Sequence, residues 1–204
     1  MSVYLKPFLY FLIFCTLIVF LVVAMQVLHQ DREPTPSSPT PPNERIWHNS
    51  SSTVSQNPKD ISQIPVRSLL NIESPLSHGD FVWDDDRIRN GHISILVDLK
   101  RQLISVFRGG HEIGTAVILY GADSKPTPNG TFRVLEKAKD YRSKTYDAPM
   151  PYMLRLTSDG VAIHGSAVRK GFATHGCIGV PLAFARHLFH VISVGDEVFI
   201  SNAF

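Results

Sequence analysis

Residues 91–120 read GHISILVDLKRQLISVFRGGHEIGTAVILY, a stretch of apolar, strand-like runs separated by short polar or glycine turns. The runs Ile93–Leu99 and Leu103–Phe107 are rich in residues that favour β-structure, and the three polar residues between them are typical of a β-hairpin. Gly109-Gly110 marks the next turn, before a third predicted strand over His111–Tyr120. This stretch therefore predicts a sheet built from short, consecutive strands.

The rest of the C-terminal half also consists of short strand-like runs separated by turns. Four further predicted strands are Thr131–Leu135, Tyr152–Thr157, Val161–His164 and Glu197–Ser201. Pro181–Ile192 alone has a helical pattern, because its apolar residues recur at near-helical spacing and proline suits a first turn. Many short strands with one or two short helices indicate a mostly β (α+β) domain of the β-sandwich or barrel type, which we place at residues 91–204.

Residues 30–90 have a different composition. The stretch from 29 to 65 holds seven of the chain's fourteen prolines, and such a segment buries too little apolar surface to offset its ordering entropy. We therefore expect a disordered or polyproline-like linker. A lead-in to the domain follows, in which Val66–Ile72 allows a short packed helix and the three aspartates at 84–86 predict a solvated turn rather than a metal site.

The N-terminus carries an uncharged run of 21 residues, Phe8–Leu28. As a helix it would extend roughly 31 Å, the thickness of a bilayer's hydrocarbon core. Cleaved signal peptides usually have a shorter apolar core of about 7–15 residues. We therefore expect residues 1–29 to form a transmembrane signal anchor that is not cleaved. Lys6 on the N-terminal side favours a single pass through the inner membrane, with the C-terminal domain on the periplasmic side.

Charge and cysteine content exclude other classes. The formal net charge is only +2, and no RNA- or DNA-reading motif is present, so nucleic acid is not an expected partner. The two cysteines are Cys15 and Cys177. Because Cys15 lies in the apolar run, Cys177 is the only thiol of the predicted domain, which therefore has no internal disulfide.

The stretch with the most chemical content is Gly160–Pro181, GVAIHGSAVRKGFATHGCIGVP. A cysteine attacks as its thiolate and needs a base or a positive environment. His175 lies two residues before Cys177 and His164 thirteen residues before it. Gly176 lets the backbone approach a substrate closely and present amide groups, as an oxyanion hole requires. We expect the intervening loop to fold His164 back onto the thiol.

The order of several short motifs resembles the catalytic domain of L,D-transpeptidases. They are AIHG (162–165), THGC (174–177), the upstream TPNGTF (127–132), PMPY (149–152) and GDEVFI (195–200). The resemblance runs from about Ile93 to Ile200. It implies a mostly β catalytic fold, peptidoglycan stem peptides as the substrate, and no metal or other cofactor.

The resemblance also implies a role for each matching residue. Cys177 matches the nucleophile and His164 the base that takes the thiol proton, while the backbone carbonyl of Gly165 matches the group that orients the imidazole. His175 and Gly176 match residues lining the oxyanion pocket, where the backbone amides of Gly176 and Cys177 would be donors. The implied reaction is acyl transfer, in which the terminal D-residue of a tetrapeptide stem leaves and an amine then takes the acyl group.

Two features depart from the family pattern. Relatives usually carry Arg or Asn two positions after the cysteine, where this chain has Gly179, and only ten residues separate His164 from His175. Both changes concern the substrate side of the predicted site. A basic run of Lys137, Lys139, Arg142 and Lys144 is expected to be a solvated face, with a groove for acidic stem peptides as the alternative.

Other functions stay open at the level of sequence. His164, His175 and Cys177 could act as three metal ligands, although their spacing is not a standard zinc pattern. A non-catalytic, membrane-anchored scaffold that binds the cell wall is a second alternative. An L,D-carboxypeptidase, in which water resolves the thioester, is a third. His187 and His190 lack partners for a metal site, so packing or surface roles are expected for them.

Overall fold

The computed structural model describes residues 45–47, 65–122 and 124–202, all within the compact unit Pro41–Phe204. The expected transmembrane segment and most of the expected linker lie outside these residues. Within the described part of the chain, no helix is long and apolar enough to cross a membrane.

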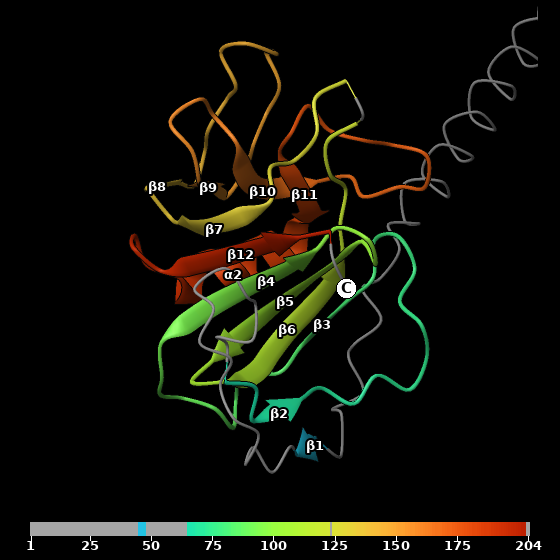
Figure 1. Ribbon diagram of the computed structural model, residues 1–204, viewed down its shortest axis with the longest axis vertical. Coiled ribbons are helices and arrows are strands. Elements are labelled where there is room, and N and C mark those ends of the chain that lie inside the picture. Colours follow the sequence, from blue (N-terminus) through green and yellow to red (C-terminus); the bar gives the residue numbers. More distant parts are fainter. Residues whose placement is uncertain (1–44, 48–64, 123, 203–204) are drawn as a thin grey trace, which may run out of the picture. The chain divides into compact units, whose positions relative to one another are not determined.

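The described chain folds into two sheets and one helix (Figure 1). The larger sheet has the order β1-β2-β6-β5-β4-β12-β7, with β3 also paired to β6. Its strands are β1 (Ile46–Trp47), β2 (Ser68–Leu69), β3 (Phe81–Trp83), β4 (Ile93–Asp98), β5 (Leu103–Arg108), β6 (His111–Val117), β7 (Gly130–Arg133) and β12 (Glu197–Ser201). The smaller sheet has the order β11-β10-β9-β8. Its strands are β8 (Glu136–Ala138), β9 (Met153–Arg155), β10 (Ala162–Ser166) and β11 (Ile178–Pro181), and the helix is α2 (Leu182–Val191).

The predicted mostly β architecture with a short helix is confirmed. β4 and β5 form the expected hairpin, in which Ile93 pairs with Arg108 and Asp98 with Leu103. The helix lies within the predicted range 181–192. The third predicted strand ends earlier than expected, at Val117, because the chain then leaves β5 and Leu119 pairs with Gly179 of the smaller sheet.

One hydrophobic core joins both sheets and the helix. Alternate residues of β4 point into this core, as the two-residue period of a strand requires. They meet apolar side chains of β10, β11 and α2, and Figure 1 shows α2 behind β12. Fully or nearly fully buried members include Ile95, Val97, Ile163, Ile178, Phe184 and Leu188. Burial of this apolar surface holds the smaller sheet, which carries the predicted site, against the larger one.

The predicted short helix at Val66–Ile72 is wrong, because part of this segment pairs with β6 as a strand. The Arg67 amide donates to the Gly110 carbonyl oxygen at 2.7 Å, and Ser68 pairs in parallel with His111. Val66 and Leu69 pack against a second small cluster that contains Phe107 and Phe199. An exposed strand edge has unpaired backbone groups, and pairing with it satisfies more of them than a single helical turn would.

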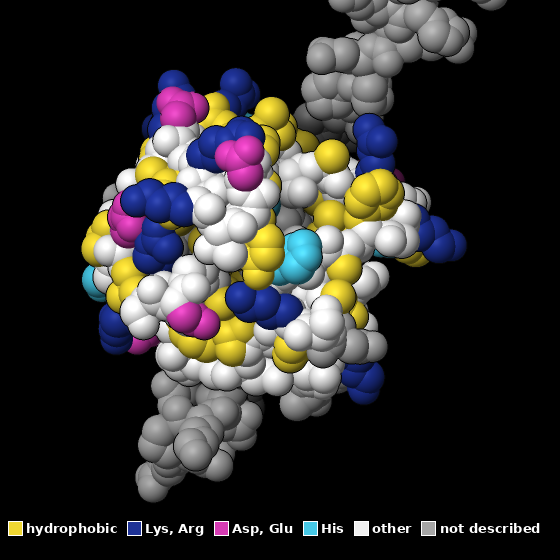
Figure 2. All heavy atoms as spheres, turned by 90° about the horizontal axis from the view of Figure 1, so that it is seen from above, with side chains coloured by type: hydrophobic (Ala, Val, Ile, Leu, Met, Phe, Trp, Pro, Cys, Tyr) yellow, Lys and Arg dark blue, Asp and Glu magenta, His cyan; other side chains and the backbone are white. Residues whose placement is uncertain are grey.

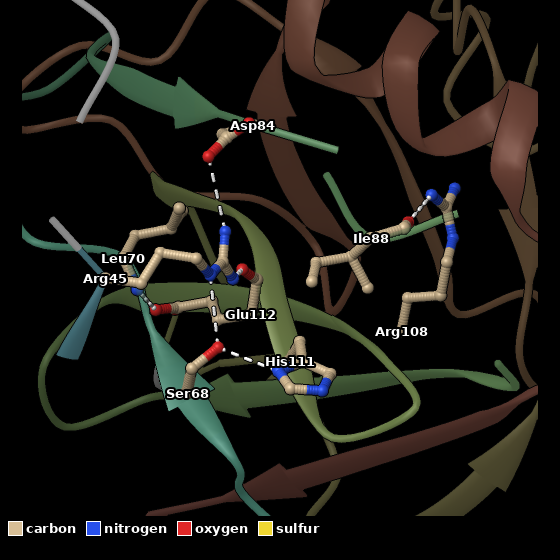
Figure 3. A network of polar contacts seen from close by, with 8 residues as sticks. All are labelled: Arg45, Ser68, Leu70, Asp84, Ile88, Arg108, His111 and Glu112. Carbon is tan, nitrogen blue, oxygen red and sulfur yellow. Dashed lines mark hydrogen bonds and ion pairs between the residues drawn. The ribbon is translucent and has the colours of Figure 1, made fainter. Parts of the chain in front are cut away.

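A buried arginine fastens the start of the described chain to this edge (Figure 3). The Arg45 guanidinium donates to Ser68 Oγ at 3.1 Å and to the Glu112 carbonyl oxygen, and forms an ion pair with Asp84 at 3.3 Å. The predicted solvated turn is therefore wrong at Asp84, since only 16% of its side chain is exposed. Its neighbour Asp85 pairs with Arg108 at 3.3 Å.

Glu112 completes the Arg45 network from the opposite side. Its carboxylate accepts the Leu70 amide at 3.0 Å. Burial raises the pKa of Glu112, while hydrogen bonds from Ser105 and Leu70 and the charge of Arg45 oppose the rise. The network therefore joins β2 and β6 to the residue before β1 and the residue after β3, through groups that are costly to leave unpaired.

We expect Arg45→Met to lower the free energy of unfolding by about 3 kcal/mol, because it leaves Asp84 and buried oxygens without their partner. Urea unfolding followed by circular dichroism measures this loss. The control is Arg101→Met, which removes an ion pair to Asp98 made by a side chain that is 59% exposed, and it should cost less than about 0.5 kcal/mol. Equal urea midpoints for the two variants would contradict a fastening role for Arg45.

Candidate active site

The pairing of β10 with β11 brings the predicted base and nucleophile to one face of the smaller sheet. Ile163 pairs with Ile178, and His164 pairs with Gly179, in a parallel ladder. Ile163 and Ile178 point into the main core, so His164 points to the opposite face. Cys177 packs there beside Ala162, two residues before His164 on the same strand face. Strand spacing and rise place the Cα atoms of His164 and Cys177 about 8 Å apart.

His164 is held in a defined orientation by the backbone of its neighbour. Its Nδ1 lies 2.9 Å from the Gly165 carbonyl oxygen. The carbonyl can only accept, so Nδ1 carries the proton and Nε2 is the free basic nitrogen. Burial lowers the pKa of His164, and the Gly165 hydrogen bond opposes this only in part. The imidazole is therefore neutral at pH 7, the form in which it can accept a proton.

Gly165 itself sits where a side chain would collide with its surroundings. A Cβ added there would lie 2.8 Å from Leu182 Cδ1 and 3.3 Å from the Pro151 carbonyl oxygen. Its amide also donates to that oxygen at 2.8 Å. The backbone that orients His164 is thus fixed by close packing against α2 and the segment around Pro151.

The Cys177 thiol is half-buried, with Sγ 3.7 Å from the Gly160 carbonyl oxygen. Burial raises the pKa of the thiol. A backbone hydrogen bond from Ala162 and the charges of Lys125 and Arg155 oppose this rise. Since the pKa of His164 is lowered and that of Cys177 is raised, the two groups rest as a neutral pair.

Two threonine hydroxyls fix the backbone of the nucleophile loop, residues 174–177. Thr174 Oγ1 donates to the Cys177 carbonyl oxygen at 2.5 Å, and the buried Thr127 Oγ1 donates to that of Gly176 at 3.1 Å. Gly176 has a φ of +98°, a conformation that strains other residues. The structural role of the two threonines does not follow from the sequence, although both lie in the motifs TPNGTF and THGC.

The segment 119–122 binds this loop to the end of β6. The Thr174 amide donates to the Tyr120 carbonyl oxygen at 2.9 Å, and the Ala122 amide to that of Thr174 at 3.1 Å. Gly121 passes so close that an added Cβ would lie 2.8 Å from Gly176 Cα. Only a glycine at 121 permits this approach.

Gly179, which departs from the family pattern, is also a point of close contact. It exchanges two backbone hydrogen bonds with Leu119, at 2.8 and 2.9 Å. An added Cβ would lie 3.0 Å from Ser166 Cβ and 3.4 Å from Leu119 Cβ. The absence of a side chain at 179 therefore has a packing reason.

His175 contacts a different part of the chain from His164 and Cys177. It is exposed, and its ring stacks on Tyr146 with centroids 4.4 Å apart and planes at 20°. Tyr146 lies at the tip of a hairpin-like loop, residues 139–152, closed by a hydrogen bond from the Met150 amide to the Tyr141 carbonyl oxygen at 2.8 Å. The site therefore has an aromatic wall that the sequence analysis missed, because no local pattern marks the tip of this loop.

The basic run divides between structural and exposed groups. Lys137 Nζ donates to the Phe189 carbonyl oxygen at 2.8 Å and to that of Ile192, so it caps the end of α2. Arg142 pairs with Asp147 at 2.6 Å, and Lys139 and Lys144 are exposed. Figure 2 shows Lys and Arg side chains spread over this end of the molecule, with a histidine among hydrophobic side chains near its centre.

The two histidines of α2 have contacts of their own. His187 stacks on Trp83 at 5.3 Å, in agreement with the expected packing role, and His190 Nδ1 lies 2.6 Å from the Arg186 carbonyl oxygen. Among the residues that the structure describes, no three His, Cys, Asp or Glu side chains are grouped as metal ligands. The geometry gives no support to a metal site built from His164, His175 and Cys177.

The neutral pair predicts how the thiol responds to pH. The rate of alkylation of Cys177 by iodoacetamide should rise steadily with pH and continue to rise above pH 9, since the thiol pKa lies above its ordinary value of 9.0. Mass spectrometry of the peptide containing Cys177 gives this rate without interference from Cys15. A plateau reached below pH 7 would instead indicate a resting thiolate–imidazolium pair.

The packing around Gly179 can be tested with paired variants. We expect Gly179→Ala to lower the free energy of unfolding by about 1–2 kcal/mol, because the new methyl group overpacks against Ser166. In Ser166→Gly/Gly179→Ala the loss should be smaller than the sum of the two single losses, as measured by urea unfolding. Additive losses would show that the two positions do not compete for the same space.

Comparison with known proteins identifies a family for this chain. A family model described as the L,D-transpeptidase catalytic domain matches residues 92–200. L,D-transpeptidase 1 of Mycobacterium tuberculosis is 28% identical over 120 residues, which cover 50% of this chain and 48% of that protein. The chain thus spans about half the length of the curated relatives it matches.

Solved structures show the same fold. A crystal structure of an L,D-transpeptidase from Stackebrandtia nassauensis has a TM-score of 0.51 at 21% identity, covering 57% of this chain and 59% of that one. An L,D-transpeptidase from Mycobacterium smegmatis has a TM-score of 0.50 at 23% identity, covering 54% and 58%. A third, solved in complex with imipenem, has a TM-score of 0.50 at 24% identity, covering 53% and 58%. Since the family match covers more than half of its residues, the chain belongs to the L,D-transpeptidase catalytic-domain family.

Proposed function

We propose that this protein is a cysteine L,D-transpeptidase that acts on peptidoglycan stem peptides through a thioester at Cys177. The observation that carries the proposal is the placement of His164 and Cys177 on one face of the smaller sheet, with Nε2 of the imidazole left free. Membership of the family supplies the reaction class.

The first half-reaction uses the neutral pair. Nε2 of His164 takes the proton of the Cys177 thiol as Sγ attacks the carbonyl carbon of an L,D peptide bond. Negative charge then develops on the carbonyl oxygen, where the backbone amides of Gly176 and Cys177 act as donors. Because the two threonine hydroxyls hold this loop in place, the donors need little rearrangement when the charge appears.

The tetrahedral intermediate then collapses by breaking its C–N bond. His164 returns its proton to the leaving nitrogen, so the terminal D-residue departs as a free amine and the stem remains as a thioester. In the second half-reaction an acceptor amine attacks the thioester and gives a proton to His164. The Cys177 thiolate leaves and recovers that proton, which restores the neutral pair.

We also propose that the protein is anchored in the inner membrane by its N-terminal apolar run, with the catalytic domain on the periplasmic side. The proposal rests on the 21 uncharged residues Phe8–Leu28 and on Lys6 before them. It agrees with the proposed reaction, since peptidoglycan lies outside the cytoplasm. Protease accessibility of the domain in spheroplasts, compared with intact cells, tests this orientation.

Acylation by imipenem tests the nucleophile directly. A relative was solved in complex with this compound, and we expect a covalent adduct on Cys177 in the wild type and none in Cys177→Ala, as read by mass spectrometry. His164→Gln should form the same adduct about 10²–10⁴ times more slowly, since the general base is lost. An adduct that forms at an unchanged rate in His164→Gln would contradict the role of that residue.

Muropeptide analysis of purified walls incubated with wild type or Cys177→Ala then defines the reaction. New cross-links that depend on Cys177 are the expected result. Shortened stems without cross-links would replace the proposal with an L,D-carboxypeptidase. No change in the muropeptides, together with no imipenem adduct, would indicate a non-catalytic scaffold.

A further inference from the structure

Three side chains form a cluster at the nucleophile loop, in which Tyr146 contacts both of the others. Lys125 Nζ lies 3.1 Å from the Tyr146 hydroxyl and 5.6 Å from the centre of its ring. The ring of Tyr146 in turn stacks on His175, two residues before the predicted nucleophile. We call Lys125, Tyr146 and His175 the mouth cluster.

Lys125 is held against the loop by its backbone, although its side chain is exposed. Its amide donates to the Ala122 carbonyl oxygen at 2.8 Å. Its own carbonyl oxygen and its Cγ lie 3.7 Å from the position that a Cβ would take on Gly176. Thr127, two residues later, donates to Gly176. The lysine therefore starts from a fixed point next to the predicted oxyanion donors.

The charge of Lys125 reaches the reacting sulfur. Lys125 and Arg155 both lower the pKa of Cys177, while Asp159 raises it. Arg155 is already engaged, since it pairs with Glu136 at 2.7 Å and covers the ring of Tyr141. The hydrogen-bond partner of Lys125 is the Tyr146 hydroxyl, and the charge of Asp159 also acts on the lysine. Within the described ranges Lys125 forms no ion pair.

In the proposed reaction the donor peptide loses its last residue. That residue carries a free C-terminal carboxylate, which therefore enters the site close to Cys177. The free α-carboxylate of that residue is only three bonds from the carbonyl carbon that Sγ attacks. A cation that recognises this carboxylate must therefore lie beside the nucleophile, and must keep a hydrogen bond that an anion can replace. Lys125 meets both conditions, whereas Lys139 projects from the 139–152 loop without a charge effect on the thiol.

We propose that Lys125 is a specificity-determining residue that binds the free C-terminal carboxylate of the donor peptide. The inference rests on the proposed function and deepens it. In the free protein the ammonium group donates to the Tyr146 hydroxyl, and in the complex it donates to the carboxylate. Donor peptides that end in a free carboxylate are then preferred over those that end in an amide.

The first experiment needs no peptidoglycan chemistry. Cys177 is alkylated with anionic iodoacetate and with neutral iodoacetamide in the full chain of wild type, Lys125→Met and Lys139→Met. A change in the thiol pKa affects both reagents equally, so the ratio of the two rates reports only attraction of the carboxylate. We expect the iodoacetate-to-iodoacetamide ratio to fall about twofold to fivefold in Lys125→Met. The ratio should be unchanged in Lys139→Met.

Salt gives an internal check on this measurement. The effect of Lys125→Met on the ratio should shrink as ionic strength rises, because salt screens exposed charges. Lys125→Arg should keep most of the wild-type ratio, since the cation is retained. A ratio that is the same in wild type and Lys125→Met at low salt would overturn the proposal.

The second experiment uses the substrate. Wild type should process a tetrapeptide stem with a free C-terminus at a higher kcat/KM than the same stem with a C-terminal amide, and Lys125→Met should lose about twofold to fivefold of that preference. Equal use of both stems by wild type would overturn the carboxylate proposal and leave the transpeptidase proposal standing. If neither stem nor imipenem acylates Cys177, the proposed function fails, and the alkylation ratio still decides whether Lys125 attracts carboxylates.

Discussion

The pair of backbone hydrogen bonds between Leu119 and Gly179 is the constraint on which the rest of the site depends. It connects the chain leaving β6 in the larger sheet to β11 in the smaller one. Cys177 lies two residues before this connection, and the preceding Thr174 is bound to Tyr120 and Ala122. The predicted nucleophile is therefore held on both sides by the segment 119–122, which follows β6. The close approach of residue 121 to this loop is possible only because Gly121 lacks a side chain.

This tight packing decides the resting chemistry. Partial burial acts in opposite directions on the two reacting groups, since it lowers the pKa of His164 and raises that of Cys177. The free protein therefore avoids a buried ion pair, which would be costly to desolvate. In the proposed reaction, charge appears only when the sulfur attacks, at the moment when the amides of Gly176 and Cys177 would gain an anion to bind. A site that works in this way would stabilise the transition state more than the resting state.

Much of the fold could be predicted from the sequence, because β4, β5 and α2 follow from local patterns. β2 and β3 could not, since they form only where the edge of β6, more than 25 residues away in the chain, offers partners. The predicted site residues came from motif order, but their meeting depends on the register of β10 and β11. The roles of Thr127 and Tyr146 arise wholly from contacts between distant segments. The reason for Gly179 likewise becomes visible only when Ser166 and Leu119 are in place.

The position of His175 shows how one short motif serves two surfaces. Its ring is exposed and stacked on Tyr146, so it takes no part in the hydrogen bond that orients His164. The backbone that follows turns inward at Gly176, where the positive φ reverses its direction. One side of the loop thus forms the mouth with the 139–152 loop, while the other side carries the thiol. Because the two functions share four residues, any movement of Tyr146 on His175 acts on the same backbone that presents the amides to the substrate.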